Sequence, residues 1–486
     1  MTKLVKRVTS VFLAASMIVT TAFSSVPASA QNTCDKTAAD VVLDMTVGWN
    51  LGNSLDATNG DGVNSETSWG NPKTTKAMID AVKRAGFNTV RVPVSWGRHT
   101  SGNNHTIDSA WMARVKEVVG YCIDNDMYVI LNTHHDINAT SDAAYYPTYA
   151  RLDASNDFLE SIWTQIANEF KDYDYHLIFE TLNEPRLVGH EYEWWWPNDS
   201  AIAEPIACIN SMNQTCLDAI RATGGNNSTR CIMVPGYCAS VYGATADGFR
   251  VPNDSADDRI IVSVHAYTPV SFTLDDNGTS VFSDSLKSEI DDIFNTIEWI
   301  DEPVIIGEMS ASNRNNSSER VKWAEYYFGK VAETIDYGAN VPCILWDNNV
   351  WINQEHAGES HGHLDRSTLT WNDEPFINAI MDTLGVSSLL IKPDVGYLQK
   401  TEVVNNCYSV RAVMLISEEE ANRISKVSFH FSNGSKNVTI DSAKCYSKIT
   451  ACGETLDAPE GYVFVVHAIQ NIPDGTTVTC TGIDKY

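Results

Sequence analysis

Eight short apolar runs divide roughly the first 350 positions of the chain, and each is bounded by polar or turn residues. The runs cover residues 46–51, 89–94, 128–132, 177–182, 231–235, 260–264, 303–307 and 341–346. Their apolar residues are continuous rather than alternating, which is typical of parallel strands that are covered on both faces. The runs therefore favour an α/β fold built around a parallel sheet.

Amphipathic helical patterns lie between most of these runs. Residues 74–85 and 108–125 space their apolar side chains by three and four, with Gly86 as a C-cap of the first and Asp108 as an N-cap of the second. Similar patterns cover residues 158–170, 206–223, 286–299 and 317–337. Strands that alternate with helices in this way predict a (β/α)8 TIM barrel. The alternative is an open doubly wound sheet, which would usually carry a glycine-rich phosphate turn after its first strand, and the sequence has none there.

The C-terminal part of the chain has a different pattern. Helical periodicity fades near residue 390, and residues 426–431, 437–440, 462–468 and 476–481 read as short strands with turn residues between them. We predict a barrel domain over residues 31–388 and a small β-sandwich-like accessory domain over residues 389–486. The small domain either binds carbohydrate or braces the barrel.

The N-terminus has the pattern of a secretory signal peptide over residues 1–30. Lys3, Lys6 and Arg7 precede an apolar stretch that is too short to span a bilayer, and Ala28 and Ala30 fit the small-residue cleavage rule. We therefore expect a secreted, extracellular protein with no membrane partner.

The chain is strongly acidic, with a formal net charge of −28. The charged residues of the signal peptide are all basic, so its removal would make the net charge of the remaining chain more negative. Such a charge argues against nucleic acid as a partner and against polyanionic substrates, whereas a neutral polymer feels no such repulsion. We expect a monomer that acts on a neutral polysaccharide.

The chain has 11 cysteines, and an odd number leaves at least one thiol unpaired within the chain. Cys122, Cys231 and Cys343 lie in apolar stretches and are expected to be buried small hydrophobes. No CxxC signature is present, so we expect neither a metal nor a cofactor. Four cysteines of the C-terminal part could form two disulfides: Cys407, Cys445, Cys452 and Cys480.

Polar and charged side chains stand where the predicted strands end. Glu184 in LIFETLNEP and Glu308 in PVIIGEM each come directly after an apolar run. Because the carboxyl ends of barrel strands meet at one mouth, we expect the two carboxylates to face each other, as cleavage of a glycosidic bond requires. The other strand ends contribute Arg91, His134, His135, Asp136, Asn183, His265, Tyr267 and Trp346.

Two of these groups can be interpreted from chemistry alone. Arg91 lies inside an apolar strand and must be paired, because its charge cannot be removed, and Glu308 is a candidate partner. His134, His135 and Asp136 could suggest a metal site, but adjacent residues of an extended chain point to opposite faces and chelate poorly.

Seven segments together resemble glycoside hydrolase family 5, the cellulase-like family of clan A barrels. They are GWNLGNSLDA at 48–57, ETSWGNPKTT at 66–75, GFNTVRVPVSW at 86–96, NTHHD at 132–136, ETLNEPR at 180–186, VHAYTP at 264–269 and IGEMS at 306–310. The resemblance extends from the first predicted strand to the eighth, and GWNLGN and WGNPKTT are similar to the endo-β-glucanase and xyloglucanase branch.

The resemblance implies a retaining endo-β-1,4-glucanase that works by double displacement, with Glu184 as the acid/base and Glu308 as the nucleophile. Because we expect less positive charge near Glu184 than near Glu308, Glu184 should hold a proton near neutrality while Glu308 stays ionised. Further roles are implied for two groups of residues. In the catalytic group, Asn183 would bond the sugar 2-hydroxyl, Arg91 and Tyr267 would hold Glu308, and His134 and His265 would position the reacting groups. In the substrate-binding group, Trp346 would form the stacking floor and Asn50, Trp69, Trp96 and His135 would contact the sugar.

Several alternatives stay open. Residues 358–362, GESHG, match the nucleophile elbow of esterases, with Ser360 as the nucleophile. His356, His361, His363 and Asp365 could bind a metal. The barrel could be an inactive carbohydrate-binding protein. The loop with Tyr192 and residues 194–196, WWW, is either a packed lid or a sugar platform. Cellulose, mixed-linkage glucan, xyloglucan, xylan and mannan are all possible substrates.

Overall fold

The computed structural model describes residues 34–336, 339–386, 388, 396–400, 407–432, 434–441, 444–451, 454–458, 461–473 and 478–486. The predicted signal peptide, residues 1–30, lies outside the described residues. The barrel and the C-terminal sheets are described separately below.

Eight parallel strands close into a barrel in the order β1-β10-β9-β8-β7-β6-β5-β2. Each of the eight apolar runs of the sequence contributes one of these strands, which confirms the predicted TIM barrel and excludes the open sheet. The strands are β1 Val47–Asn50, β2 Thr89–Val92, β5 Tyr128–Asn132, β6 Leu177–Glu180, β7 Ile232–Ser240, β8 Ile260–His265, β9 Val304–Met309 and β10 Cys343–Leu345.

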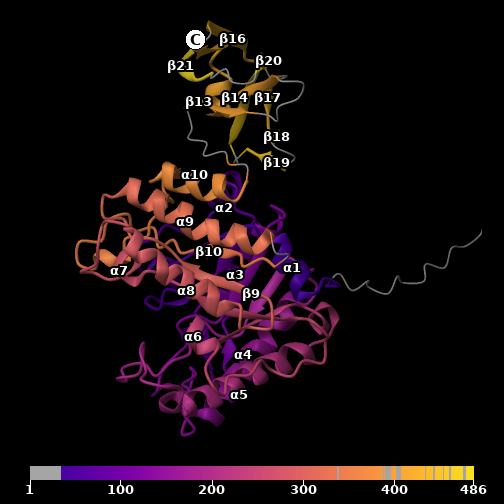
Figure 1. Ribbon diagram of the computed structural model, residues 1–486. Coiled ribbons are helices and arrows are strands. Elements are labelled where there is room, and N and C mark those ends of the chain that lie inside the picture. Colours follow the sequence, from indigo (N-terminus) through magenta and orange to yellow (C-terminus); the bar gives the residue numbers. More distant parts are fainter. Residues whose placement is uncertain are drawn as a thin grey trace, which may run out of the picture. The chain divides into compact units, whose positions relative to one another are not determined.

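Helices connect the strands and surround the barrel (Figure 1). Asp108 caps the helix that follows it, because its side chain accepts a hydrogen bond from the Trp111 N–H at 2.9 Å. The helices are α1 Ala38–Asp44, α2 Lys76–Arg84, α3 Ser109–Ile123, α4 Leu152–Phe170, α5 Ala203–Ala222, α6 Val241–Ala244, α7 Val270–Thr273, α8 Lys287–Ile297, α9 Ser317–Asp336 and α10 Glu374–Thr383. Short 3-10 turns include η1 Gly62–Thr67, η3 Asp199–Ile202 and η6 Ala357–Glu359, and two small hairpins pair β3 Thr100–Ser101 with β4 Thr106–Ile107 and β11 Leu364–Asp365 with β12 Thr370–Trp371.

Six of the eight strands, β5 to β10, share their apolar side chains between two layers. In β5, Ile130 belongs to the cluster inside the barrel, whereas Val129 and Leu131 pack in the layer between the strands and the surrounding helices. Helix α1 contributes Val41 and Val42 to the inner cluster, so it closes the N-terminal end of the barrel. Burial of each such side chain stabilises the fold by about 1.5–3 kcal/mol. The opposite, carboxyl-terminal end is left for polar chemistry.

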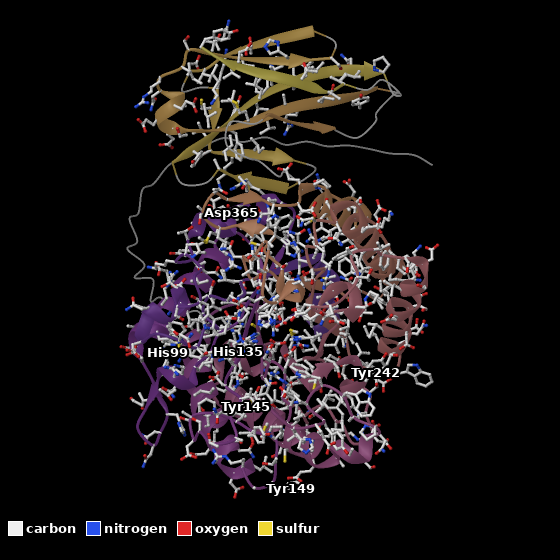
Figure 2. All side chains as sticks on the ribbon, turned by 90° about the vertical axis from the view of Figure 1, so that its left-hand side faces the viewer. His99, His135, Tyr145, Tyr149, Tyr242 and Asp365 are labelled. Carbon is white, nitrogen blue, oxygen red and sulfur yellow. The ribbon has the colours of Figure 1, made fainter. Side chains whose placement is uncertain are left out.

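Aromatic residues are found in both environments. Tyr145 is buried, whereas Tyr149 and Tyr242 lie at the surface, as Figure 2 shows. Within the described residues, no helix combines the length and the apolar content needed to cross a bilayer.

The C-terminal residues form antiparallel sheets, as predicted. A four-stranded sheet has the order β13-β14-β20-β17 and a three-stranded sheet has the order β16-β15-β21. Met414 and Val465 of the first sheet share an apolar core with Phe429 of the second, which makes this part sandwich-like. The elements are β13 Gly396–Lys400, β14 Cys407–Ser417, α11 Glu418–Ala421, β15 Lys426–Phe431, β16 Gly434–Thr439, β17 Cys445–Tyr446, β18 Lys448–Ala451, β19 Glu454–Asp457, β20 Tyr462–Pro473 and β21 Cys480–Lys485.

The cysteine predictions have mixed outcomes. Cys122, Cys231 and Cys343 are buried, as expected. Cys445 is a free thiol, so the four C-terminal cysteines do not form the two disulfides that the sequence allowed. Cys452 lies outside the described residues.

Candidate active site

Glu184 and Glu308 meet at the carboxyl-terminal mouth of the barrel, as the sequence predicted. Glu308 lies in β9, and Glu184 follows the end of β6. One oxygen of each carboxylate lies within 4.8 Å of the other, with His265 Nδ1 between them. His265 Nδ1 is 2.8 Å from Glu184 Oε1 and 3.6 Å from Glu308 Oε2. The two acids therefore face each other across one small space.

Arg91 is completely buried in β2 and is paired with two carboxylates rather than one. Its Nη1 lies 2.7 Å from Glu308 Oε1, and its Nη2 lies 2.7 Å from Glu180 Oε2. The guanidinium also donates to Asn183 Oδ1 at 2.8 Å and to Asn50 Oδ1 at 3.0 Å. One planar group thus fixes the positions of Glu308 and Asn183.

Tyr267 holds the second oxygen of Glu308. Its hydroxyl donates to Glu308 Oε2 at 2.9 Å, while Arg91 occupies Oε1. Burial and the neighbouring Glu308 carboxylate raise the pKa of Tyr267 well above its usual range, so the hydroxyl keeps its proton and stays a donor. Glu308 is therefore oriented from both sides, and the predicted Arg91–Tyr267–Glu308 arrangement is present.

The surroundings of Glu184 differ from the expectation. Burial raises the pKa of Glu184, but the hydrogen bond from His265 and the charges of His265 and Arg186 lower it by more, so the net direction is downward. Arg186 Nη1 lies 3.6 Å from Glu184 Oε2. The prediction that Glu184 by itself holds a proton near neutrality is thus wrong, because tertiary packing brings the basic groups of His265 and Arg186 to it.

The pKa of His265 shifts in the opposite direction to that of Glu184. Burial lowers the pKa of His265, but the carboxylates of Glu308 and Glu184 outweigh that effect and raise it. Its other ring nitrogen, Nε2, is buried without a hydrogen-bond partner among the described residues. A proton held between His265 and Glu184 is therefore available beside the acid.

The other predicted aromatic and histidine residues form one wall of the mouth. The rings of His134 and Trp346 are parallel, with an interplanar angle of 3° and centroids 5.8 Å apart. Burial lowers the pKa of His134 well below its usual range, so the ring is neutral. His135 and Trp69 are adjacent, with centroids 5.5 Å apart, and both are partly exposed. These four side chains are placed where a sugar could contact them.

Two predicted substrate contacts are contradicted by the structure. Asn50 is fully buried and is engaged by Arg91 and by the carbonyl oxygens of Gly307 and Ile344. Trp96 is also fully buried, and its Nε1 donates to the Asn132 carbonyl at 2.9 Å. Both side chains support the site from within the barrel and present no surface to a sugar.

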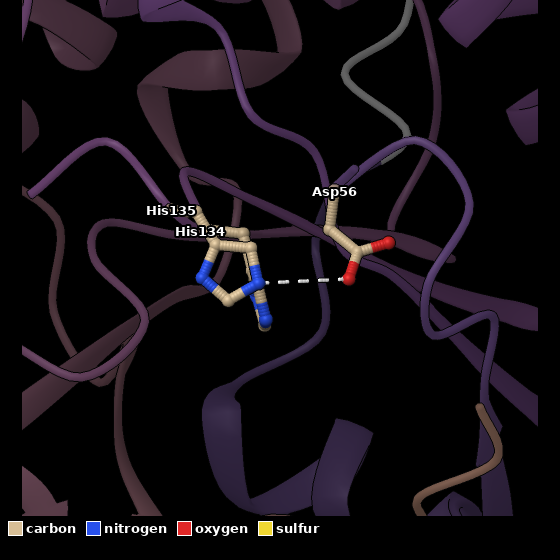
Figure 3. A group of neighbouring side chains, drawn as sticks. All are labelled: Asp56, His134 and His135. Atoms are coloured by element: carbon tan, nitrogen blue, oxygen red, sulfur yellow. Dashed lines mark ion pairs between the residues drawn. The ribbon is translucent and has the colours of Figure 1, made fainter. Parts of the chain in front are cut away.

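Asp56, His134 and His135 form one of two groups with the spacing of metal ligands among the described residues (Figure 3). Two of the three residues, Asp56 and His134, are already engaged in hydrogen bonds. Asp56 accepts the N–H groups of Asn53 and Ser54, and the Asn132 amide donates to His134 Nδ1 at 3.1 Å. With that hydrogen bond the His134 proton sits on Nε2, which leaves no lone pair on this ring for a metal.

The loop alternatives are not supported. Ser360 follows the short turn η6 rather than a buried strand, and its hydroxyl accepts the Asn353 N–H, so the esterase elbow is wrong. His363 contacts Ser310 and Arg320, whereas His356 pairs with Asp276 at the surface. Neither group of potential metal ligands in the described part of the chain includes any of the histidines from this loop.

Sequence reasoning missed two charged residues of the site. Glu180 is fully buried in β6 and accepts hydrogen bonds from Arg91, Asn132 and Ser263. An acid inside an apolar run must be paired, so Glu180 could have been matched with Arg91, which has the same signal. Arg186, directly after NEP, was not given a role.

The comparisons with known proteins agree with this geometry. Residues 55–350 match the family model for cellulase (glycosyl hydrolase family 5). The chain is 45% identical over 358 residues to endoglucanase A of Clostridium longisporum, covering 71% of this chain and 65% of that protein. The chain therefore spans just under two thirds of that relative's own length.

Two solved structures are similar in fold and sequence. One is a GH5-4 broad specificity endoglucanase from Ruminococcus champanellensis with bound cellotriose, with a TM-score of 0.65, 46% identity and coverage of 72% of this chain and 99% of that chain. The other is a xyloglucan-specific endo-β-1,4-glucanase from a metagenomic library in complex with cellotriose, with a TM-score of 0.64, 37% identity and coverage of 71% and 98%.

Proposed function

Since the chain belongs to glycosyl hydrolase family 5, as its motifs suggested, we propose that it is a retaining endo-β-1,4-glucanase. The observation that carries the proposal is the pair of facing acids, Glu184 and Glu308, whose nearest oxygens lie within 4.8 Å. A short separation is typical of retaining enzymes, with carboxyl groups about 5–5.5 Å apart, because inverting enzymes need about 6.5–9.5 Å to admit a water molecule.

In the first step, Glu308 attacks the anomeric carbon and Glu184 gives its proton to the glycosidic oxygen, so that the leaving chain departs as an alcohol. Arg91 and Tyr267 hold the two oxygens of Glu308 in line for this attack. In the second step, the Glu184 carboxylate takes a proton from water, the hydroxide bonds to the anomeric carbon, and the Glu308 ester is released as carboxylate.

The proton that Glu184 gives in the first step is shared with His265 in the resting site, and the proton taken from water in the second step restores it. Transfer from His265 Nδ1 to Glu184 Oε1, over 2.8 Å, leaves neutral imidazole and a protonated acid. Asn183 is held through its Oδ1 by Arg91, so its Nδ2 is the atom we assign to the sugar 2-hydroxyl. The parallel His134 and Trp346 rings form the floor beneath the sugar that Glu308 attacks.

The substrate is proposed to be a neutral plant-cell-wall β-glucan. Both similar structures hold cellotriose, and the acidic chain would repel a polyanion. Xyloglucan is a second candidate, because a cavity of about 410 Å³ adjoins His135 and could receive a side branch. Its lining includes Thr58, Arg98 and Ile137.

The test is reducing-sugar release from carboxymethyl cellulose, barley β-glucan, xyloglucan, xylan and mannan. We expect Glu184→Gln and Glu308→Gln each to lose about three or more orders of magnitude in rate, while Glu325→Gln, an exposed acid on α9, matches the wild type. Proton NMR of the first product formed should show retained anomeric configuration. Activity that survives in either active-site variant, or an inverted product, would contradict the proposed mechanism. An inactive wild type would favour a carbohydrate-binding barrel.

We also propose that the protein is exported, which the basic, apolar and small-residue pattern of residues 1–30 supports. N-terminal sequencing of protein recovered from the culture medium should begin at Gln31. A retained Met1 would contradict this proposal.

A further inference from the structure

The loop after Glu184 is anchored at its base. The Tyr237 hydroxyl in β7 donates to the Tyr192 carbonyl at 2.6 Å and accepts the Leu187 N–H at 3.2 Å. The Cys238 N–H donates to the Pro185 carbonyl at 3.0 Å. The loop therefore starts from a fixed position on β7 and is not free to move as a unit.

Two tryptophans nonetheless project from this anchored loop. Trp194 is 59% exposed and Trp195 is 68% exposed, whereas Trp196 packs edge-on against Tyr237 with centroids 5.3 Å apart. Large exposed aromatic surface is unfavourable unless something covers it in use, and flat rings suit the apolar faces of sugars. Exposure alone does not separate Trp194 from Trp195.

Contact with Arg186 separates them. The Arg186 guanidinium carbon lies 4.1 Å from the centroid of the Trp194 ring. The same guanidinium donates to the Glu184 carbonyl at 3.0 Å, lies 3.6 Å from Glu184 Oε2 and pairs with Glu193 Oε1 at 3.0 Å. Glu193 is itself held, because its Oε2 accepts the Gly189 N–H at 2.7 Å. One partly buried cation thus contacts both an exposed tryptophan and the proposed acid.

The strand order shows that Trp346 and Trp194 lie on opposite sides of the barrel mouth. Trp346 and His134 follow the ends of β10 and β5, on the side of the barrel that contains β1 and β2, whereas the loop with Trp194 is anchored to β7. Glu184 lies between these two walls. If the attacked sugar rests on Trp346, the chain that departs with the Glu184 proton extends towards Trp194.

We propose that Trp194 is the stacking surface for the leaving half of the substrate, and that Arg186 is a positioning residue that links this surface to Glu184. The inference rests on the proposed glycosidase function and adds to it a determinant of which substrates are cleaved well. A glucan long enough to reach Trp194 presses against a ring that Arg186 braces, and Arg186 in turn sets the charge felt by the acid.

Several charged or titratable groups face Glu184, and Arg186 is one of two cations close to it. Arg186 lowers the pKa of Glu184, as do His265 and His135. Removing the Arg186 charge should therefore raise the pKa of Glu184 and keep the acid protonated to higher pH. The other titratable groups near enough to interact with Glu184 are Glu308, Glu359, Tyr145, Cys238 and Tyr267.

The test compares two substrates across pH. Cellopentaose extends past the cleavage point, whereas β-cellobiosyl fluoride has a leaving group too small to reach Trp194 and in little need of a proton. We expect Trp194→Ala to lower kcat/KM on cellopentaose by about 10- to 100-fold. On the fluoride, the factor by which kcat/KM falls should be at least about five times smaller. Trp195→Ala is the matched control and should lose no more than about twofold on either substrate.

Arg186 is tested separately. Arg186→Gln should lower kcat/KM on cellopentaose and move the basic limb of its pH profile to higher pH, while Arg186→Lys, which keeps the charge, should leave that limb in place. Equal losses on both substrates, an unmoved limb in Arg186→Gln, or equal losses in the two tryptophan variants would overturn the inference. Those results would leave the proposed function intact, because the wild type would still cleave cellopentaose. A wild type that cleaves neither substrate would reject both.

Discussion

Glu180 offers a test of how the buried charges support the site. Its carboxylate is completely buried and accepts from three donors. Arg91 Nε and Asn132 Nδ2 reach Oε2 at 2.8 and 2.9 Å, and Ser263 Oγ reaches Oε1 at 2.6 Å. In Glu180→Gln the amide oxygen can accept from Arg91 and Asn132, and the amide nitrogen can donate to Ser263. The shape is kept and only the charge is lost.

The expected cost follows from these contacts. A hydrogen bond to a charged group contributes about 1.5–3 kcal/mol, whereas a neutral one contributes about 1 kcal/mol. Summed over the three donors, the free energy of unfolding should fall by about 3 kcal/mol. The loss is smaller than that expected for a buried arginine with no carboxylate at all, because Glu308 remains beside Arg91. For a barrel of this size that corresponds to a loss of roughly 4 °C in melting temperature.

Activity should fall as well. With Glu180 neutral, Arg91 is drawn towards Glu308, its remaining carboxylate, and both Glu308 and Asn183 move with it. We expect kcat/KM on the preferred glucan to fall about tenfold or more, since small displacements of reacting groups are costly.

Glu66 provides the matched control. It is buried against Arg114, with contacts of 2.8 Å, and Arg114 also pairs with Glu117, just as Arg91 has a second acid. Glu66→Gln should therefore lose similar stability with unchanged kcat/KM. Thermal unfolding and steady-state kinetics of the two variants decide the matter. The reasoning is refuted if Glu180→Gln melts within about 1 °C of the wild type, or if both variants lose activity equally.

Three further predictions follow from single contacts. In Gly52→Ala the new methyl would lie 2.7 Å from the Trp346 ring, so we expect KM for a glucan to rise about tenfold, and an unchanged KM would show that Trp346 is not the sugar floor. His265→Gln removes the group whose raised pKa keeps a proton beside Glu184, so the basic limb of the kcat/KM profile should move to lower pH, and a limb that stays in place or moves to higher pH would contradict the role of His265. Arg230→Met removes the charged donor that binds four carbonyls between the end of α4 and the start of β6. Chemical denaturation should show a loss of about 3 kcal/mol or more with kcat unchanged, and a loss under about 1 kcal/mol would mean that water replaces the guanidinium.

Local patterns in the sequence were enough to predict the fold and the acids. Continuous apolar runs mark strands covered on both faces, and an acid that directly follows such a run must lie at the barrel mouth, which located Glu184 and Glu308. The charge of Arg91 within a strand required a buried partner, and Glu308 is one of the two. These inferences hold because they depend only on the spacing of apolar residues along the chain and on the free-energy cost of burying a charge.

Contacts between distant segments were decided by the tertiary structure. Asn50 and Trp96 lie close in sequence to the proposed site residues, yet both side chains are buried in the barrel wall. The sequence does not show whether a side chain at these positions faces the wall or the substrate. The low pKa of Glu184 arises from His265 and Arg186, which reach it from a different strand and from its own loop. Electrostatics depends on distance in space, so the acid could be found from the sequence, whereas its state of protonation could be read only from the folded site.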